Sequence, residues 1–187
     1  MTYAKDRIYL DADSHLMELP DFLTSHADPS VRERLPRINF ESGGRSSDSL
    51  ENAAKTGAHS SETVAELVAL GDDLIAGPKG YLALGAFNKE ERRTALDLLG
   101  FDQQFIFSTF SAPIAFDPNS DLELRYGAAR AHNRAMSDFC SADDRLVGGA
   151  LLPLDDPRAA LEELELAISL ELKAVWVPHR PAGGGSP

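Results

Sequence analysis

The chain has one cysteine, few basic residues and no long hydrophobic run, and each shortage excludes a class of protein. Cys140 has no second cysteine with which to form an intrachain disulfide, so nothing indicates an oxidising compartment. The 18 Lys and Arg residues face 30 Asp and Glu residues, and the net charge is −12. That balance argues against nucleic acid and anionic membranes as partners, because both require clustered cations. No segment approaches the roughly 18 apolar residues of a membrane span, so we expect a soluble, cytoplasmic protein.

A glycine-rich phosphate-binding loop is also missing. Residues 11–18 follow the first apolar run, residues 8–10, and contain no glycine. A dinucleotide-binding sheet would carry Gly-x-Gly-x-x-Gly at this point, and a nucleotide phosphate loop would carry its lysine. The 187 residues, 43% of them hydrophobic, are nevertheless enough to bury one sizeable core, so we expect a single domain.

The second half of the chain alternates helical and strand patterns. We expect helices over residues 88–100, 120–139 and 156–172, and strands over residues 104–109, 146–152 and 173–178. In the last helix, Leu161, Leu164, Ile168 and Leu172 would form the buried stripe. The strands are apolar almost throughout, which is typical of a parallel sheet covered on both faces. Two architectures fit, an open doubly wound sheet and the first half of a closed barrel, and the missing phosphate signatures favour the barrel.

A less regular insertion, residues 16–87, separates the first strand from this alternating part. Within it, residues 43–49 are typical of a mobile loop, and residues 61–70 predict a short amphipathic helix that ends at Gly71. Residues 182–187 are rich in glycine and predict a flexible tail.

The most distinctive motif lies at the end of the first strand. Asp13 and His15 are two residues apart, so on an extended strand their side chains point the same way and could bind one divalent ion. Carboxylate and imidazole together suit zinc, iron or manganese. Asp11 has the same parity and could be a third ligand or could orient the imidazole, and Glu18 would lie in the following loop. Alternatively, Asp11 and Asp13 are turn residues and His15 is an ordinary polar residue.

Residues 10–22 resemble the opening strand of the amidohydrolase-related family, the branch of the metal-dependent amidohydrolases that includes aminocarboxymuconate-semialdehyde decarboxylase. Residues 95–104, 132–140, 144–153 and 173–181 resemble the segments that follow, in the same order. The resemblance implies a distorted (β/α)8 barrel with one divalent metal, usually zinc. It also implies hydrolysis of C–N or C–O bonds, or removal of a carboxylate without an organic cofactor. The family's first-strand ligand pair, often His-x-His, maps onto Asp13 and His15.

The family places further ligands and a catalytic histidine on its fifth, sixth and eighth strands, beyond the four strands expected here. We therefore expect an α/β chain that forms the N-terminal half of a (β/α)8 TIM-type barrel, apparently truncated, with parallel strands 1–4 and an insertion after strand 1. Such a chain would hold none of the family's remaining catalytic residues and would be inactive alone. Its open sheet edges and exposed inner face would favour a homo-oligomer.

Other residues have simpler expected roles. His179, just past the fourth strand, could contact a substrate or could be an ordinary loop histidine. Cys140 and Trp176 are expected in the core, His132 at the surface or in packing, and Arg92 on a solvated helix face.

Three functions remain open. The first is a metal-dependent hydrolase or non-oxidative decarboxylase, amidohydrolase-related, completed by residues elsewhere and acting on a small carboxylic acid, amide or ester. The second is a folded, non-catalytic remnant or oligomerisation module. The third is an unrelated α/β binding domain.

Overall fold

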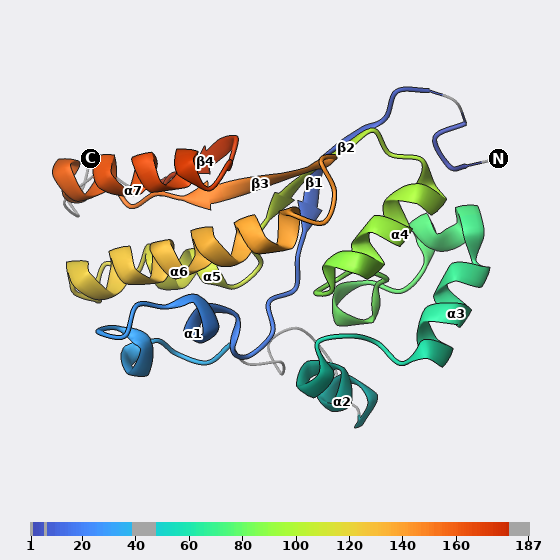
Figure 1. The fold of residues 1–187 in the computed structure, drawn as a ribbon, viewed down its shortest axis with the longest axis horizontal. Helices are drawn as coiled ribbons and strands as arrows, with labels where there is room; N and C mark the ends of the chain where they lie inside the picture. Colours follow the sequence, from blue (N-terminus) through green and yellow to red (C-terminus); the bar gives the residue numbers. More distant parts are fainter. Residues whose placement is uncertain (1, 6, 39–47, 180–187) are drawn as a thin grey trace.

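The sheet contains four parallel strands in sequential order. The computed structural model describes residues 2–5, 7–38 and 48–179, and for residues 48–50 it describes the backbone only. The strands are β1 (Leu10–His15), β2 (Gln103–Phe107), β3 (Leu146–Leu151) and β4 (Ala174–Trp176), in the order β1-β2-β3-β4 (Figure 1). A doubly wound sheet would reverse its strand order, whereas sequential order is that of a barrel. The prediction of an α/β half-barrel is confirmed.

Three capped helices connect the strands. They are α4 (Lys89–Leu99), α6 (Leu122–Cys140) and α7 (Pro157–Ser169). The side chains of Asn88, Asp121 and Asp156 accept hydrogen bonds from backbone N–H groups in the first turns, and each cap is worth about 1 kcal/mol. Helix α4 ends at Gly100, whose φ of 74° a residue with a side chain adopts only at a cost. The local signals in the sequence therefore predicted these helices well.

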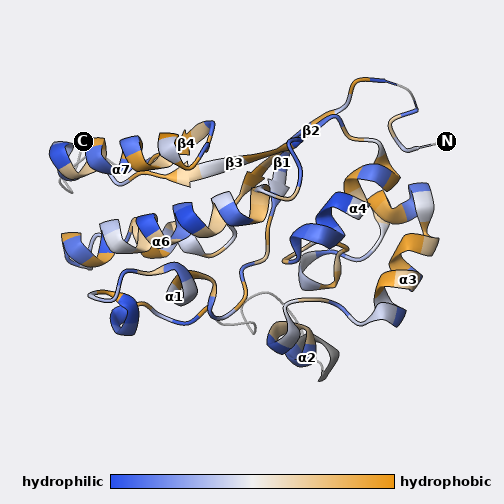
Figure 2. Cartoon of the chain, viewed as in Figure 1, coloured by the Kyte–Doolittle hydropathy of each residue, from blue (hydrophilic) through white to orange (hydrophobic). Residues whose placement is uncertain are grey.

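The main core lies between the sheet and helices α4 and α6. Ile106 of β2 and Met136 of α6 are fully buried there. Gly148 of β3 permits the close contact, since a Cβ atom at this position would lie 2.7 Å from Cγ of Met136. Cys140 packs against the same cluster, and burial raises the pKa of its thiol to about 12, so the thiol stays protonated. These surroundings agree with a core cysteine. Figure 2 shows the hydrophobic colour of β2 and β3 in this layer.

The prediction of the buried stripe is wrong at Leu161 and Ile168, whereas Leu172 is buried in the main core and Leu164 is partly buried. Leu161 is 56% exposed and Ile168 is 65% exposed, while Ala160, Glu163 and Ala167 are the buried residues of this helix. The physical reason is a pair of polar contacts with α6. Arg130 and Asn133 each place a nitrogen 3.1 Å from the carboxylate of Glu163, so the helix turns this carboxylate inward and places Leu161 and Ile168 on its exposed side.

The insertion contains several short helices. These are α1 (Phe22–His26), η1 (Arg32–Arg34), α2 (Asp48–Thr56), α3 (Ser61–Ala69), η3 (Gly71–Ala76) and η4 (Gly80–Leu82), and α5 (Ser111–Ala115) follows β2. Helix α3 confirms the predicted helix over residues 61–70. Of the loop predicted over residues 43–49, the last two residues begin α2 and the rest lie outside the described residues, as does the tail 182–187. Within the described ranges, no helix has the length and apolar character needed to cross a bilayer.

Candidate functional site

His15 ends β1 at the carboxyl edge of the sheet, with one ring nitrogen fixed and the other available. Its Nδ1 lies 3.2 Å from the carbonyl oxygen of Ser108, the residue that follows β2. A carbonyl oxygen can only accept a hydrogen bond, so a neutral His15 ring that makes this contact carries its proton on Nδ1 and has its lone pair on Nε2. Nε2 lies 3.5 Å from Oδ1 of Asp13, and the two side chains are 43% and 91% exposed. Metal-binding histidines are commonly oriented in this way, by a backbone carbonyl on the opposite nitrogen.

Asp11 does not share this arrangement, because the strand is irregular. The pairing of β1 with β2 shifts register between Asp11 and Ser14, which interrupts the parity expected from the sequence. Oδ2 of Asp11 accepts a hydrogen bond of 3.0 Å from Gln104, and Oδ1 accepts one from the N–H of Asp13. Among the described residues, no three His, Cys, Asp or Glu side chains form a group that could hold a metal ion. The structure therefore brings Asp13 and His15 together and leaves Asp11 in other contacts.

Arg92 is buried beneath β1, so the expected solvated position is wrong. Its guanidinium donates to the carbonyl oxygens of Gly85 and His15, at 2.7 and 2.8 Å, and to the side chains of Ser14 and Gln104. Burial lowers the pKa of Arg92 to about 10, which leaves it charged at neutral pH. The sequence did indicate this burial, because Arg92 lies three and four residues before Ala95 and Leu96 and therefore on the same, buried face of α4.

Glu18 follows β1, as expected, but it is fully buried and was missed as a positioning residue. Its carboxylate accepts hydrogen bonds of 2.9–3.0 Å from the backbone N–H groups of Thr109, Phe110 and Ser111, and one of 2.9 Å from the Ser111 hydroxyl. These donors directly follow Ser108. Glu18 therefore fixes the segment whose carbonyl orients the candidate ligand.

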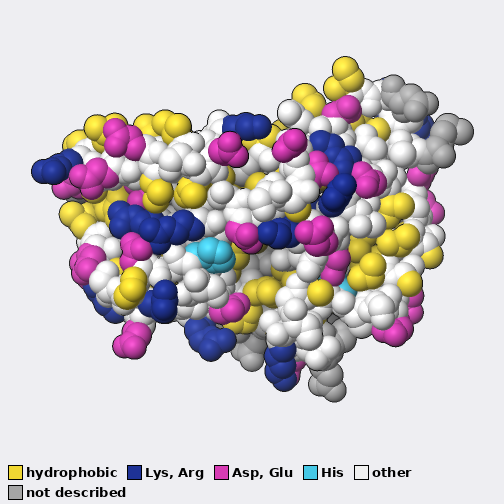
Figure 3. Space-filling view, viewed as in Figure 1, with side chains coloured by type: hydrophobic (Ala, Val, Ile, Leu, Met, Phe, Trp, Pro, Cys, Tyr) yellow, Lys and Arg dark blue, Asp and Glu magenta, His cyan; other side chains and the backbone are white. Residues whose placement is uncertain are grey.

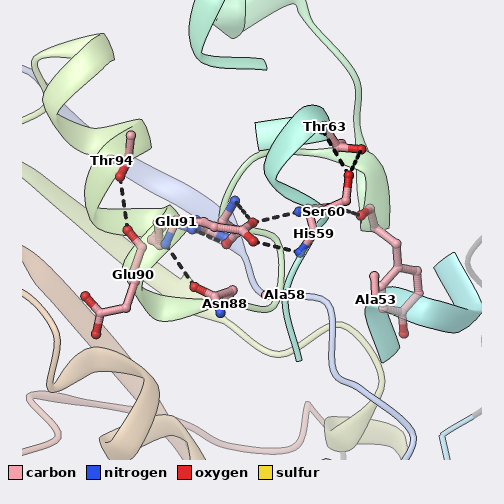
Figure 4. A network of polar contacts seen from close by, with 12 residues as sticks. Ala53, Ala58, His59, Ser60, Thr63, Asn88, Glu90, Glu91 and Thr94 are labelled. Atoms are coloured by element: carbon pink, nitrogen blue, oxygen red, sulfur yellow. Dashed lines mark hydrogen bonds and ion pairs between the residues drawn. The ribbon is translucent and has the colours of Figure 1, made fainter. Parts of the chain in front are cut away.

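A second buried cluster joins the insertion to α4 (Figure 4). Nδ1 of His59 lies 2.7 Å from Oε2 of Glu91, and Nε2 lies 2.8 Å from the carbonyl oxygen of Tyr81. Both ring nitrogens thus face acceptors. Burial alone would lower the pKa of His59, but the hydrogen bonds to Glu91 and Tyr81 outweigh it and raise the pKa. The Tyr81 hydroxyl donates to the backbone carbonyl of Glu18 at 2.6 Å, so this cluster also supports the end of β1.

His179 lies at the same edge of the sheet, in the wall of a pocket beyond β4. Trp176, expected in the core, is instead 36% exposed and contributes to this pocket. His132 is fully buried and packs on the sheet, with Nε2 3.2 Å from the carbonyl oxygen of Gly149, and burial lowers its pKa. Packing is thus the role that the structure gives His132. On the face drawn in Figure 3, acidic and basic side chains are interspersed rather than gathered by sign.

The comparisons with known proteins identify a shared fold. A solved amidohydrolase from Mycobacterium avium subsp. paratuberculosis K-10 matches 95% of this chain with a TM-score of 0.62 and 18% sequence identity. The match covers 50% of that protein, so this chain spans about half its length. No family model matches, and no curated protein matches. At this identity the likeness concerns fold alone, and the half-barrel interpretation agrees with it. The narrower branch indicated by residues 10–22 stays a prediction.

Proposed function

We propose that this chain supplies the first-strand part of the active site of a metal-dependent hydrolase with an amidohydrolase-type barrel. The observation that carries the proposal is the orientation of His15. In the neutral ring that donates from Nδ1 to the carbonyl of Ser108, the Nε2 lone pair is directed to the exposed side, next to the carboxylate of Asp13. An imidazole nitrogen beside a carboxylate oxygen suits zinc, and also manganese or iron.

The residues present fit only part of such a metal site. A catalytic centre uses about three protein ligands, and the described residues bring together only Asp13 and His15. The amidohydrolase of similar fold is about twice as long as this chain. We infer that the remaining ligands come from a complementary half-barrel, and that the chemistry belongs to the completed barrel.

The exposed end of the sheet supports completion by another half. In the described part of the chain, no strand pairs with the outer edge of β4. Val175 and Val177 are 46% and 40% exposed beside the outward leucine and isoleucine of α7. An unpaired edge and an apolar surface favour association. A second copy of this chain, as a homo-oligomer, is the simplest partner that we propose.

The substrate that we propose is a small carboxylic acid, amide or ester. A divalent metal held by Asp13, His15 and further ligands would favour hydrolysis by activating water, and non-oxidative decarboxylation is the other reaction that the sequence resemblance implies. The alternative is a folded, non-catalytic oligomerisation module, which the exposed apolar edge of β4 and α7 also favours. Metal retention distinguishes the two functions.

The test is the zinc, manganese and iron content of untagged protein, measured by mass spectrometry after purification without added metal. We expect close to one ion per chain in the wild type and a loss of most of it in His15→Ala. His26→Ala is the matched control, because His26 is partly buried in α1, where its Nδ1 contacts the carbonyl of Phe22. Equal metal content in the two variants would refute the proposal, and wild-type protein without metal would favour the non-catalytic module.

A further inference from the structure

A pocket of about 500 Å³ opens at the carboxyl ends of β2 and β4. Its volume lies within the range of small-molecule sites. Its apolar walls come from α5, from the segment after α5 and from the end of β4. Its lining includes Thr109, Phe116, Asp117, Trp176 and His179.

Two aromatic rings make a corner in this pocket. The rings of Phe116 and Trp176 lie 6.4 Å apart with an interplanar angle of 76°. A flat ring placed against such a corner can stack on one side chain and meet the edge of the other, which are the two favoured aromatic geometries. Trp176 also meets Phe107 edge-on at 5.5 Å, and Phe107 lies 5.7 Å from the ring of His15. Trp176 is thus connected to His15, the candidate metal ligand, through the ring of Phe107.

The charge in the pocket is negative. Asp117 accepts hydrogen bonds from the N–H and the side chain of Asn119, both at 3.0 Å, and from the hydroxyl of Ser120 at 3.1 Å. These bonds keep the carboxylate ionised and lower its pKa. No Lys or Arg is found among the described residues that line the pocket. A carboxylate in the ligand would therefore be repelled by Asp117 more strongly than an uncharged amide would be.

We propose that this pocket is a subsite for an uncharged planar ring, and that Phe116 and Trp176 hold the ring at the same edge of the sheet that carries His15. The inference rests on the proposed function, because it assigns an aromatic amide or ester, rather than an aromatic carboxylate, to the same edge of the barrel. Trp176 and Phe116 position the ring, and Asp117 selects against anions.

Trp176 is the single tryptophan of the chain, so its fluorescence reports on this pocket directly. The experiment titrates metal-free protein with benzamide and, separately, with benzoate. We expect benzamide to change the Trp176 emission saturably, and benzoate to bind about tenfold more weakly because of Asp117. Phe116→Leu keeps apolar packing but removes the ring, and should weaken benzamide binding about threefold to tenfold.

Two further variants make the test decisive. Asp117→Asn removes the charge and can still accept hydrogen bonds, so benzoate should approach benzamide in affinity. Glu165→Ala, at an exposed position of α7, should leave both titrations unchanged. Benzoate binding as tightly as benzamide, no saturable change with benzamide, or unaltered binding in Phe116→Leu would overturn the inference. Metal content is measured separately, so failure of this subsite and failure of the metal site give different results.

Discussion

The two ends of the sheet differ in how many contacts their side chains make within the chain. At the β1–β2 end, two buried charged groups find several partners within the chain: Glu18 accepts hydrogen bonds from four donors and Arg92 donates four. At the β4–α7 end, apolar side chains such as Leu161 and Ile168 remain more than half exposed. Ile8, just before β1, and Leu10, its first residue, are also exposed, at 83% and 61%. The chain therefore secures the buried polar groups around the candidate ligand His15 by itself, and leaves apolar surface at both outer strands available to another chain.

The largest expected effect comes from removing the carboxylate that secures the β1–β2 end. Glu18→Ala would leave three backbone N–H groups and one hydroxyl buried without their acceptor. We expect the free energy of unfolding to fall by about 3–5 kcal/mol, as measured in urea. Glu165→Ala, at an exposed position of α7, is the control and should change it by less than about 0.5 kcal/mol. Similar losses in the two variants would mean that Glu18 does not secure this end.

At the open end, substitution should change assembly and leave the fold intact. The double variant Leu161→Asp with Ile168→Asp places charges on the exposed stripe of α7. We expect light scattering to show a shift from oligomer to monomer, because charge opposes burial of this surface. The unfolding free energy of the monomer should change by less than about 1 kcal/mol. A wild type that is already monomeric at micromolar concentration would remove the proposed association.

A smaller, pH-dependent effect is expected from the cluster that supports the end of β1. The pKa of His59 is raised above its ordinary value of 6.5, so its stabilising contribution is fully present below pH 6.5 and is lost as the pH rises through the raised pKa. The pKa of Glu91 is lowered, so its contribution is present above its ordinary value of 4.5 and is lost as the pH falls through the lowered pKa.

We therefore expect the pair to stabilise the fold most between these two transitions. Urea unfolding as a function of pH should show a loss of stability on the alkaline side in the wild type that is absent in His59→Gln. The exposed pair of Arg158 and Glu162 offers a control, since Glu162→Gln should leave the alkaline loss unchanged. The same pH profile in His59→Gln and the wild type would contradict the role of His59.

The sequence predicted the features that depend on local chemistry. Helix caps such as Asn88 and Asp156 and the stop at Gly100 are set by neighbouring residues, and the apolar strands indicated a parallel sheet. The predictions of buried positions were wrong where contacts with residues distant in the chain determine which side chains face the core. The inward turn of Glu163 depends on Arg130 and on Asn133, both 30 or more residues away in the chain.

In the candidate site, too, local spacing predicted some features, and contacts between distant residues determine the others. The spacing of Asp13 and His15 predicted that their side chains lie close together, and in the structure Nε2 of His15 is 3.5 Å from Oδ1 of Asp13. The register shift in β1, which separates Asp11 from this pair, depends on pairing with β2 across about 90 residues of chain. The hydrogen bonds of Glu18 and Arg92 also reach over long separations in sequence, so spacing alone could not reveal them.

Side-chain nitrogen NMR reports directly on the orientation of His15. In ¹⁵N-labelled protein, we expect the neutral His15 ring to carry its proton on Nδ1, in contact with the carbonyl of Ser108, and added zinc to shift the Nε2 resonance. A proton on Nε2 in the neutral ring, or a His15 spectrum unchanged by zinc, would contradict the proposed metal site.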